Sequence, residues 1–343
     1  MSSGFSESTE YFLKRYEVFQ AAVDRFHTEL DRAFRALGDA VRPRGFAVHV
    51  WHPGIQHMLQ FSRPGWLNDG GEGIHFEFFA DFEELARRRL VIGLDFGSCV
   101  PEKEKLRASL SRLLSPHEQW LLREGYEVHR NKDWKFLRTT LALPGLTLEG
   151  MEAKCALLPD IAAFVDEALF LSDKTAIWRT DFFPNDPSLA LNWCGREGGQ
   201  DIIRGSGRLG SAALRIDGTC PNARSGEKGC YSVLVQGTRD IKNGTEYSAC
   251  VVLRSRAGGS LRIRGEGHKE PTTRDGKRSF PHAFSWSRDI QPSDRWQCVS
   301  FQGVVPSVED VDYDFGEQGT WIVMNIETED REFLIDSIEI GSA

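Results

Sequence analysis

The chain has 343 residues, of which 40% are hydrophobic and 27% are charged, and this length and composition predict two globular domains with apolar cores. Its formal net charge of −8 is shared about evenly between the halves, so neither half has the basic excess that nucleic-acid binding requires. No run of residues is apolar enough for a membrane span and the first residues do not resemble a signal peptide, so we expect a cytoplasmic protein.

The first predicted element is a long amphipathic helix with Ser8 as its N-cap and Gly38 as its end. Apolar residues recur at steps of three or four along one face: Phe12, Tyr16, Phe19, Val23, Phe26, Leu30, Phe34 and Leu37. This face is rich in aromatic rings, which suit packing on a sheet better than a coiled-coil seam. We therefore expect the helix to pack within the chain, with a homo-oligomer contact as the alternative.

The next segments alternate between strand and helix patterns. Period-two alternation predicts strands at 46–51, 74–79, 90–96, 126–129 and 136–143. Helical spacing predicts helices at 102–114 and 160–170. Residues 1–170 are thus predicted to form an α+β domain, in which one antiparallel sheet is flanked by helices.

Helical periodicity does not return after a predicted linker at Leu171 to Ala176. Short apolar runs separated by turn signals predict an all-β sandwich over residues 176–343. The clearest strand patterns are GRLGSAALRI, NGTEYSACVVL, WQCVSFQGVVP and FLIDSIEI, which begin at Gly207, Asn243, Trp296 and Phe333.

These four segments, in this order, resemble the jelly-roll carbohydrate-binding modules of glycoside hydrolases. The resemblance covers residues 176–343 and implies a non-catalytic module that recognises a glycan. A protein or nucleic-acid surface recognised through the same sandwich is the alternative partner, although the charge does not favour nucleic acid.

Sugar rings stack on aromatic faces, and their hydroxyls need planar polar partners. Trp286 and Tyr231 are the predicted contact rings, and Arg262 and Arg264, which alternate on one strand face, are the predicted hydrogen-bond donors. Trp296 is expected to be a core ring, because the family uses this strand for core packing.

The same resemblance implies a structural calcium ion. In the family, an acidic residue of the last strand often helps to hold calcium, and Asp336 matches that position. Asp181 is the predicted partner ligand from the first strand.

A second possible metal site lies in the first half. His49, His75, Glu77 and Asp95 occupy the polar positions of their strands and would converge if these strands are neighbours. Two carboxylates with imidazoles suit a divalent metal, and a solvated polar sheet face is the alternative.

The first half also resembles the small domains that accompany PD-(D/E)XK nucleases in bacterial defence proteins. The resemblance rests on IGLDFGSC around Asp95, on Lys103 and Lys105, and on Trp134. The lysine that a nuclease needs after the second acid is absent, so the resemblance implies an inactive scaffold. An active, metal-dependent nuclease-like domain remains the enzymatic alternative.

Two further patterns have structural interpretations. The segment GSGRLG, Gly205 to Gly210, fits a dinucleotide-binding pattern, but no helix pattern follows it, so we expect a turn before a strand. Of seven cysteines, Cys220 and Cys230 could be bridged in an oxidising compartment, whereas the absence of a secretion signal favours reduced thiols.

The sequence contains no nucleophile with an evident base and no phosphate-binding loop. We therefore predict a non-catalytic recognition protein. The alternatives are a metal-dependent, defence-associated enzyme and an assembly protein that uses the first helix.

Overall fold

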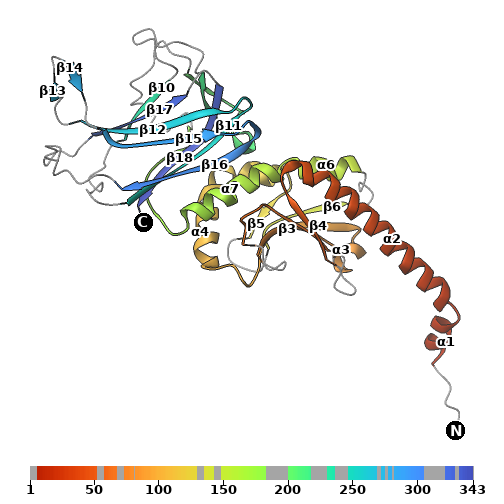
Figure 1. Cartoon of the computed structure of the whole chain (residues 1–343). Coiled ribbons are helices and arrows are strands. Elements are labelled where there is room, and N and C mark those ends of the chain that lie inside the picture. Colours follow the sequence, from red (N-terminus) through yellow and green to blue (C-terminus); the bar gives the residue numbers. More distant parts are fainter. Residues whose placement is uncertain are drawn as a thin grey trace. The chain divides into compact units, whose positions relative to one another are not determined.

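The computed structural model describes residues 6–51, 58–67, 73–80, 82–129, 135–142, 148–182, 200–217, 230–235, 246–268, 272–274, 277–279, 282–304, 321–328 and 332–342. The chain forms two compact units. The first contains Met1–Lys103 and Leu121–Leu157, and the second contains Glu104–Trp120 and Leu158–Ala343. Figure 1 labels many of the helices and strands of both units.

The first unit is α+β. Its helices are α1 (Glu7–Leu13), α2 (Tyr16–Val41), the 3-10 turn η1 (Arg42–Arg44), α3 (Phe82–Ala86) and α6 (Leu148–Cys155). Its strands are β1 (Ala47–Trp51), β2 (Met58–Ser62), β3 (Ile74–Phe79), β4 (Arg89–Phe96), β5 (Glu127–Val128) and β6 (Lys135–Ala142). Helix α5 (Glu118–Arg123) crosses the boundary between the units.

The six strands form one antiparallel sheet in the order β1-β2-β3-β4-β6-β5. The five strands expected in this half are all confirmed, and β2 is an addition that the sequence analysis missed. The pairing register gives the sheet one apolar face, represented by the row Val48, Phe61, Phe76 and Leu94. The adjacent row, His49, Gln60, Glu77 and Gly93, belongs to the opposite face.

The long first helix differs from its prediction at both ends. A break at residues 14 and 15 separates α1 from α2, and Ser6 rather than Ser8 caps α1. Helix α2 continues past Gly38 to Val41. Gly38 instead allows close packing, because a Cβ atom there would lie 3.2 Å from Val48 Cγ1 of β1. No helix among the described residues is long and apolar enough to cross a membrane.

Only the second half of the apolar stripe packs within the chain. Leu30, Phe34 and Leu37 are buried at 5%, 1% and 0% exposure. Phe12 and Phe19 are 47% and 57% exposed. The expectation of intramolecular packing along the whole stripe is therefore wrong for its first half.

The second unit combines helices with a β-sandwich. Its helical elements are α4 (Lys103–Leu114), η2 (Ser115–His117), α7 (Leu158–Leu171) and the short turn η5 (Arg208–Gly210). Its strands are β7 (Thr175–Thr180), β8 (Gln200–Ile203), β9 (Ala213–Asp217), β10 (Cys230–Val235), β11 (Glu246–Ser255), β12 (Gly259–His268), β13 (Thr272–Arg274), β14 (Lys277–Ser279), β15 (His282–Ile290), β16 (Ser293–Val304), β17 (Trp321–Thr328) and β18 (Glu332–Ser342).

Two antiparallel sheets make the sandwich, which confirms the predicted fold class. Sheet B has the order β16-β11-β18-β9-β8, with β7 also paired to β18, and sheet C has the order β10-β17-β12-β15. Side chains from both sheets form one apolar core, which includes Val251, Ile263, Phe301 and Ile338. The four strand patterns that carried the resemblance correspond to β9, β11, β16 and β18.

A bulge interrupts the last strand at Asp336. Val252 of β11 pairs with Ser337, but the next residue, Leu253, pairs with Ile335, so Asp336 has no opposite residue. Phe333, Ile335, Ile338 and Ile340 therefore all face the core, although their spacing is not strictly alternating. A bulge re-aims the side chain of its extra residue, here a buried carboxylate.

Helix α7 covers the outer face of sheet B. Ala163 of α7 packs with Ala213, Cys250, Val252 and Trp296. The sequence pattern predicted this helix within the first domain, 1–170, whereas it is grouped with the second unit. Whether residues 1–170 and 176–343 fold as separate domains stays a prediction.

The cysteines differ from the expectation of reduced thiols. Cys250 and Cys298, on the neighbouring strands β11 and β16, are joined by a disulfide. Among the described residues, Cys99 and Cys155 are free. The possible Cys220–Cys230 bridge lies outside the described side chains.

Candidate functional sites

The outer face of sheet C presents polar groups to solvent. Arg262 is exposed and lies between two core-facing residues of β12. It pairs in register with Ser287 on β15 and with position Glu327 on β17. The Ser287 hydroxyl lies 3.5 Å from that of Ser260, and Asp289, opposite Ser260, is also exposed. A guanidinium, two hydroxyls and a carboxylate are thus gathered on this face.

Trp286 is a core residue, which corrects its prediction as an exposed contact ring. It is 9% exposed, and its ring stacks on Phe301 with centroids 6.3 Å apart. A Cβ atom on Gly303 would lie 2.4 Å from Trp286 Nε1, so the glycine makes room for the indole. With its faces packed in the sandwich, Trp286 is not available to stack on a sugar.

Tyr231 and Arg264 lie on described strands, but their side chains are outside the described part of the structure. The backbone register places Tyr231 opposite Ile326, in the row that contains Ile263 and Trp286. Arg264 occupies the same strand as Arg262, two residues further on. Their roles as ligand contacts stay predictions.

Trp296 is a core ring, as predicted. It is 3% exposed and belongs to the cluster that packs sheet B against α7. The Arg254 guanidinium lies 4.8 Å from its ring centroid.

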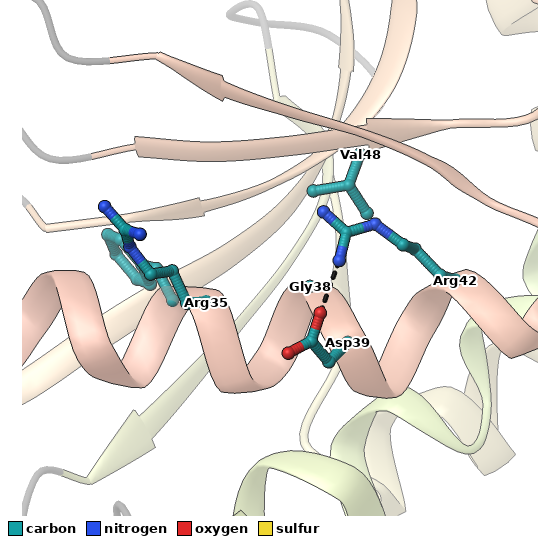
Figure 2. A pocket seen from close by; sticks show the side chains of 6 residues that line it. Arg35, Gly38, Asp39, Arg42 and Val48 are labelled. Carbon is teal, nitrogen blue, oxygen red and sulfur yellow. Dashed lines mark hydrogen bonds and ion pairs between the residues drawn. The ribbon is translucent and has the colours of Figure 1, made fainter.

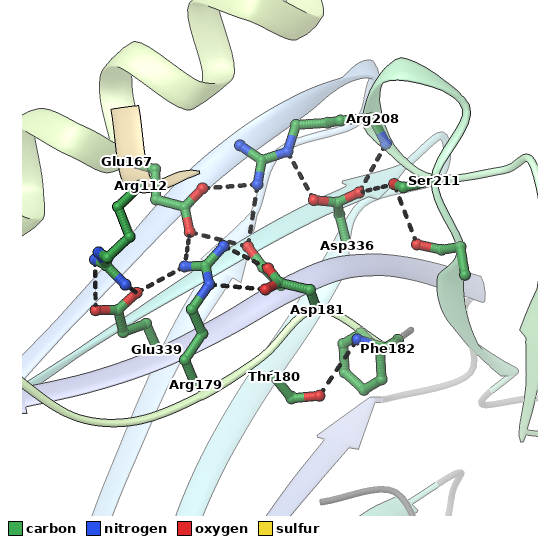
Figure 3. A network of polar contacts seen from close by, with 12 residues as sticks. Arg112, Glu167, Arg179, Thr180, Asp181, Phe182, Arg208, Ser211, Asp336 and Glu339 are labelled. Carbon is green, nitrogen blue, oxygen red and sulfur yellow. Dashed lines mark hydrogen bonds and ion pairs between the residues drawn. The ribbon is translucent and has the colours of Figure 1, made fainter. Parts of the chain in front are cut away.

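The glycine-rich turn GSGRLG binds the carboxylate of Asp336 (Figure 3). The Arg208 backbone N–H donates to Asp336 Oδ1 and its Nε donates to Oδ2, both at 2.7 Å. The Ser211 hydroxyl donates to Oδ1 at 2.9 Å. A Cβ atom on Gly207 would lie 2.7 Å from Asp336 Oδ1 and closer still to Ser211, so the turn requires glycine there. The prediction of a turn before a strand is confirmed.

Two more arginines extend this contact into a buried network on the outer face of sheet B (Figure 3). Glu167 of α7 accepts from Arg208 Nη2 and from Arg179 Nη1, each at 2.6 Å. Arg179 also donates to Glu339, which pairs at 2.9 Å with Arg112 of α4. The network ties strands β7 and β18 to helices α4 and α7.

Burial and charge set the protonation states in this network. Burial would raise the pKa of Glu167, but Arg208 and Arg179 outweigh it and lower the pKa to about 2. Burial raises the pKa of Asp181 above its usual value, although Arg179 opposes the change. Burial lowers the pKa of His117, whose ring centroid is 5.0 Å from that of Phe164, to about 4.

The calcium site predicted at Asp336 and Asp181 does not fit these contacts. Both oxygens of Asp336 accept hydrogen bonds from the Arg208–Ser211 turn, and both oxygens of Asp181 accept from Arg179. Calcium needs six to eight oxygen ligands, whereas each of these carboxylates already faces a guanidinium cation. Arginine takes the place in which the resemblance implied calcium.

In the first unit, three of the four predicted metal ligands come together. His75 and Glu77 alternate on β3, and Asp95 of β4 lies directly opposite His75. One ligand atom from each lies within 4.8 Å of the others. His49 does not join them: it is exposed on β1, and Gln60 of β2 lies between it and Glu77 in the same row.

Lys135 completes this cluster and was missed by the sequence analysis. Its ammonium lies 2.9 Å from Glu77 Oε1, although β6 and β3 are separated by β4. The side chain crosses β4 at Gly93, where a Cβ atom would lie 3.2 Å from Lys135 Cδ. Lys135 is paired in register with Asp95. A lysine thus reaches the acids from a neighbouring strand rather than from the position after Asp95.

The two carboxyl groups of the cluster differ in their pKa. Burial and the neighbouring negative charge of Glu77 raise the pKa of Asp95 to about 6. Burial would also raise the pKa of Glu77, but contacts with His75 and Lys135 outweigh it and lower the pKa below its usual value. Glu77 is therefore the ionised member of the pair.

A shallow cavity of about 260 Å³ lies between α2 and β1 (Figure 2). Phe34, Arg35, Gly38, Asp39, Arg42 and Val48 line it. Arg42 and Asp39, three residues apart, form an ion pair in its lining, and neither the histidines nor the carboxylates of the cluster are among its lining residues. We assign it no ligand.

No family model and no curated protein match the chain. Among solved structures, the CBM22-2 xylan-binding domain of Paenibacillus barcinonensis Xyn10C matches with 13% identity and a TM-score of 0.33, over 48% of this chain and 99% of that one. The CBM22-1–GH10 modules of Clostridium thermocellum xylanase 10B, complexed with xylohexaose, match 45% of this chain with 12% identity and a TM-score of 0.29.

The chain spans 26% of the length of the Clostridium protein and 50% of the tandem CBM22 domains of the Paenibacillus protein. These carbohydrate-binding modules do not bear on the resemblance of the first half to nuclease-associated domains, which stays a prediction. At these scores, the ligands of the similar proteins say nothing about this chain, whose sandwich is established by its own strand pairing.

Proposed function

We propose that the protein is a non-catalytic recognition protein whose sandwich binds a glycan on the outer face of sheet C. The observation that carries the proposal is the exposed polar row around Arg262, with Ser287 beside it and Asp289 nearby. The corresponding face of sheet B is occupied by α7 and the arginine network.

The chemistry of this row suits a polyhydroxylated ligand. A guanidinium has five N–H donors in a planar fork and can bind neighbouring hydroxyls, while serine hydroxyls and a carboxylate accept from others. With Trp286 in the core, binding on the described part of this face rests on hydrogen bonds. Exposed hydrogen bonds compete with water, so we expect weak, selective binding rather than tight binding.

Binding can be tested by isothermal titration of the full-length chain with a panel of soluble oligosaccharides, including xylohexaose and β-glucan fragments. We expect Arg262→Ala to weaken binding by about 10-fold or more, the scale of one charged hydrogen bond. Arg288→Ala is the matched control, because Arg288 is exposed on the same sheet but pairs with core-facing Leu261. It should leave the affinity unchanged.

Equal losses in the two arginine variants would contradict a site centred on Arg262. If no oligosaccharide binds, the glycan proposal fails and a macromolecular surface becomes the ligand to test on the same face. Both variants change exposed residues, so circular dichroism should show that they fold like the wild type.

A further inference from the structure

The His75–Glu77–Asp95 cluster contains hydrogen-bonding atoms that the described residues leave without partners. The three side chains are 3%, 1% and 6% exposed. His75 Nε2 and Asp95 Oδ1 make no hydrogen bond within the described structure. Buried polar atoms are normally paired, and each exception needs a physical explanation.

The hydrogen bond of the other ring nitrogen fixes the tautomer of neutral His75. Its Nδ1 lies 3.0 Å from the Gly73 carbonyl oxygen, and a carbonyl can only accept, so Nδ1 carries the proton. In the neutral ring, Nε2 then has a bare lone pair, 3.8 Å from the Glu77 carboxylate. A lone pair that faces a carboxylate is unfavourable. Either a proton on Nε2, which would then donate to Glu77, or a metal ion bound between the two groups relieves it.

We propose that His75 Nε2, Glu77 and Asp95 are ligands of one divalent transition-metal ion of the zinc type. One imidazole nitrogen and two carboxylate oxygens suit zinc, whereas magnesium and calcium prefer sites made of oxygen alone. The Gly73 carbonyl oxygen fixes the ring by accepting a hydrogen bond from Nδ1–H, as partners of metal-binding histidines usually do.

The burial of all three ligands assigns this ion a structural role. A nucleic-acid phosphate could not reach ligands that are 1–6% exposed without opening the sheet. The ion would instead join β3 to β4, beside the small apolar cluster of Met58, Phe79 and Val91. This inference does not depend on the glycan proposal, which concerns the other unit.

Lys135 is the competitor of the metal. Its ammonium supplies the positive charge at Glu77 and lies 4.3 Å from the Phe79 ring centroid. Its side chain is 13% exposed, so the charged end can turn outward to water when a metal takes its place. Removing this charge should therefore strengthen metal binding, which a purely structural lysine would not do.

The test is a Zn²⁺ titration of the full-length chain against a chromophoric chelator, with Co²⁺ absorption as a second measure of coordination. We expect the wild-type chain to bind one Zn²⁺. We expect Lys135→Met to bind Zn²⁺ roughly 10-fold more tightly than the wild type, or better, because a competing positive charge is removed. Lys14→Met is the matched lysine control: Lys14 follows the last residue of α1, its side chain is 78% exposed, and the substitution should not affect affinity.

Asp95→Asn preserves side-chain size and should weaken binding at least 10-fold, whereas His49→Gln, on the same sheet face but outside the cluster, should not. Because the cysteines remain in every variant, selective loss in Asp95→Asn assigns the site. Binding by Lys135→Met alone would show that the lysine, and not a metal, occupies the site in the wild type, and would overturn the proposal. The proposal is also overturned if neither wild type nor Lys135→Met binds Zn²⁺, or if folded Asp95→Asn binds it like the wild type.

Discussion

Arg208 is a fully buried cation, and the free-energy cost of burying its charge depends on the acidic partners around it. Its guanidinium contacts Asp336 and Glu167 and lies 3.6 Å from the Phe164 ring centroid. Replacing a whole buried ion pair with apolar residues is often neutral, whereas removing one partner leaves a buried charge and costs roughly 3–5 kcal/mol. A single substitution in this network should therefore lower the free energy of unfolding far more than the same substitution at an exposed charged residue.

His117 gives the second unit a specific pH dependence. The folded protein lowers its pKa from 6.5 to about 4 by burial, so between these values the unfolded chain binds a proton that the folded chain does not. Stability should therefore fall as the pH falls from about 6.5 to 4, by at most about 3 kcal/mol from this residue. Calorimetric unfolding at several pH values measures the slope.

The His117→Gln variant should lose that part of the slope, because glutamine does not titrate. His49→Gln, at an exposed site in the first unit, should keep it. An unchanged slope in His117→Gln would show that another group causes the acid destabilisation.

At the scale of elements, the apolar stripe of α2 is mostly exposed in the first half of the helix and buried in its second half. Substitutions in the two halves should therefore differ in their effect on stability. Phe34→Ala should cost about 3–5 kcal/mol, because its ring is 1% exposed and truncation leaves a cavity. Phe19→Ala, at 57% exposure on the same helix, should change stability by less than about 0.5 kcal/mol. Urea unfolding followed by circular dichroism compares the two.

A large cost for Phe19→Ala would mean that the first half of the helix is covered in solution. Size-exclusion chromatography at several concentrations would then show whether a second copy provides that cover, as the assembly alternative requires.

Strand patterns were the most predictable elements, because alternation directly reflects a sheet with one buried face. Ile74 to Phe79 was predicted with the bounds that β3 has. The bulge at Asp336 was visible as a break in the alternation, but its consequence was not, since the partner that Asp336 meets lies on a distant turn. The helix break after Leu13 had no glycine or proline to signal it.

At the scale of the molecule, the sequence predicted both folds but only part of each candidate site. Strand alternation brought His75, Glu77 and Asp95 to one face, whereas the adjacency of Lys135 depends on the order β3-β4-β6, which alternation does not encode. Trp286 was predicted to be an exposed ring, but which side chains of β15 face the core depends on how the strand pairs with its neighbour. Helix α7 was assigned to residues 1–170, whereas it is grouped with the second unit, because its apolar face does not specify a partner.

The segment 176–343 should form a β-rich fold when expressed alone, but a weak one. It lacks Glu167, so Arg208 and Arg179 lose a buried partner, and it lacks the cover that Ala163 provides on sheet B. We expect 158–343 to be more stable by about 3–5 kcal/mol in urea unfolding. Far-UV circular dichroism checks the strand content of both.

The variant Glu167→Gln in the longer segment is the control for the charge contribution. This variant should lose much of the extra stability of 158–343 over 176–343, although it keeps the apolar cover of α7. If 176–343 alone is as stable as 158–343, the network adds no stability to the sandwich, and a domain boundary at residue 176 includes everything that the sandwich needs.

Strand β18 also determines how this unit can fold. It pairs with β11 along one edge and with β9 and β7 along the other, so Ile338 meets Thr180 from the opposite end of the unit. Hairpins such as β12–β15 can form from neighbouring segments, but sheet B needs a large loop to close first, which slows folding. Until that closure, β11 and β9 have unpaired edges. A substitution that weakens the pairing of β18 should therefore cause aggregation during refolding before it reduces ligand binding by the folded protein.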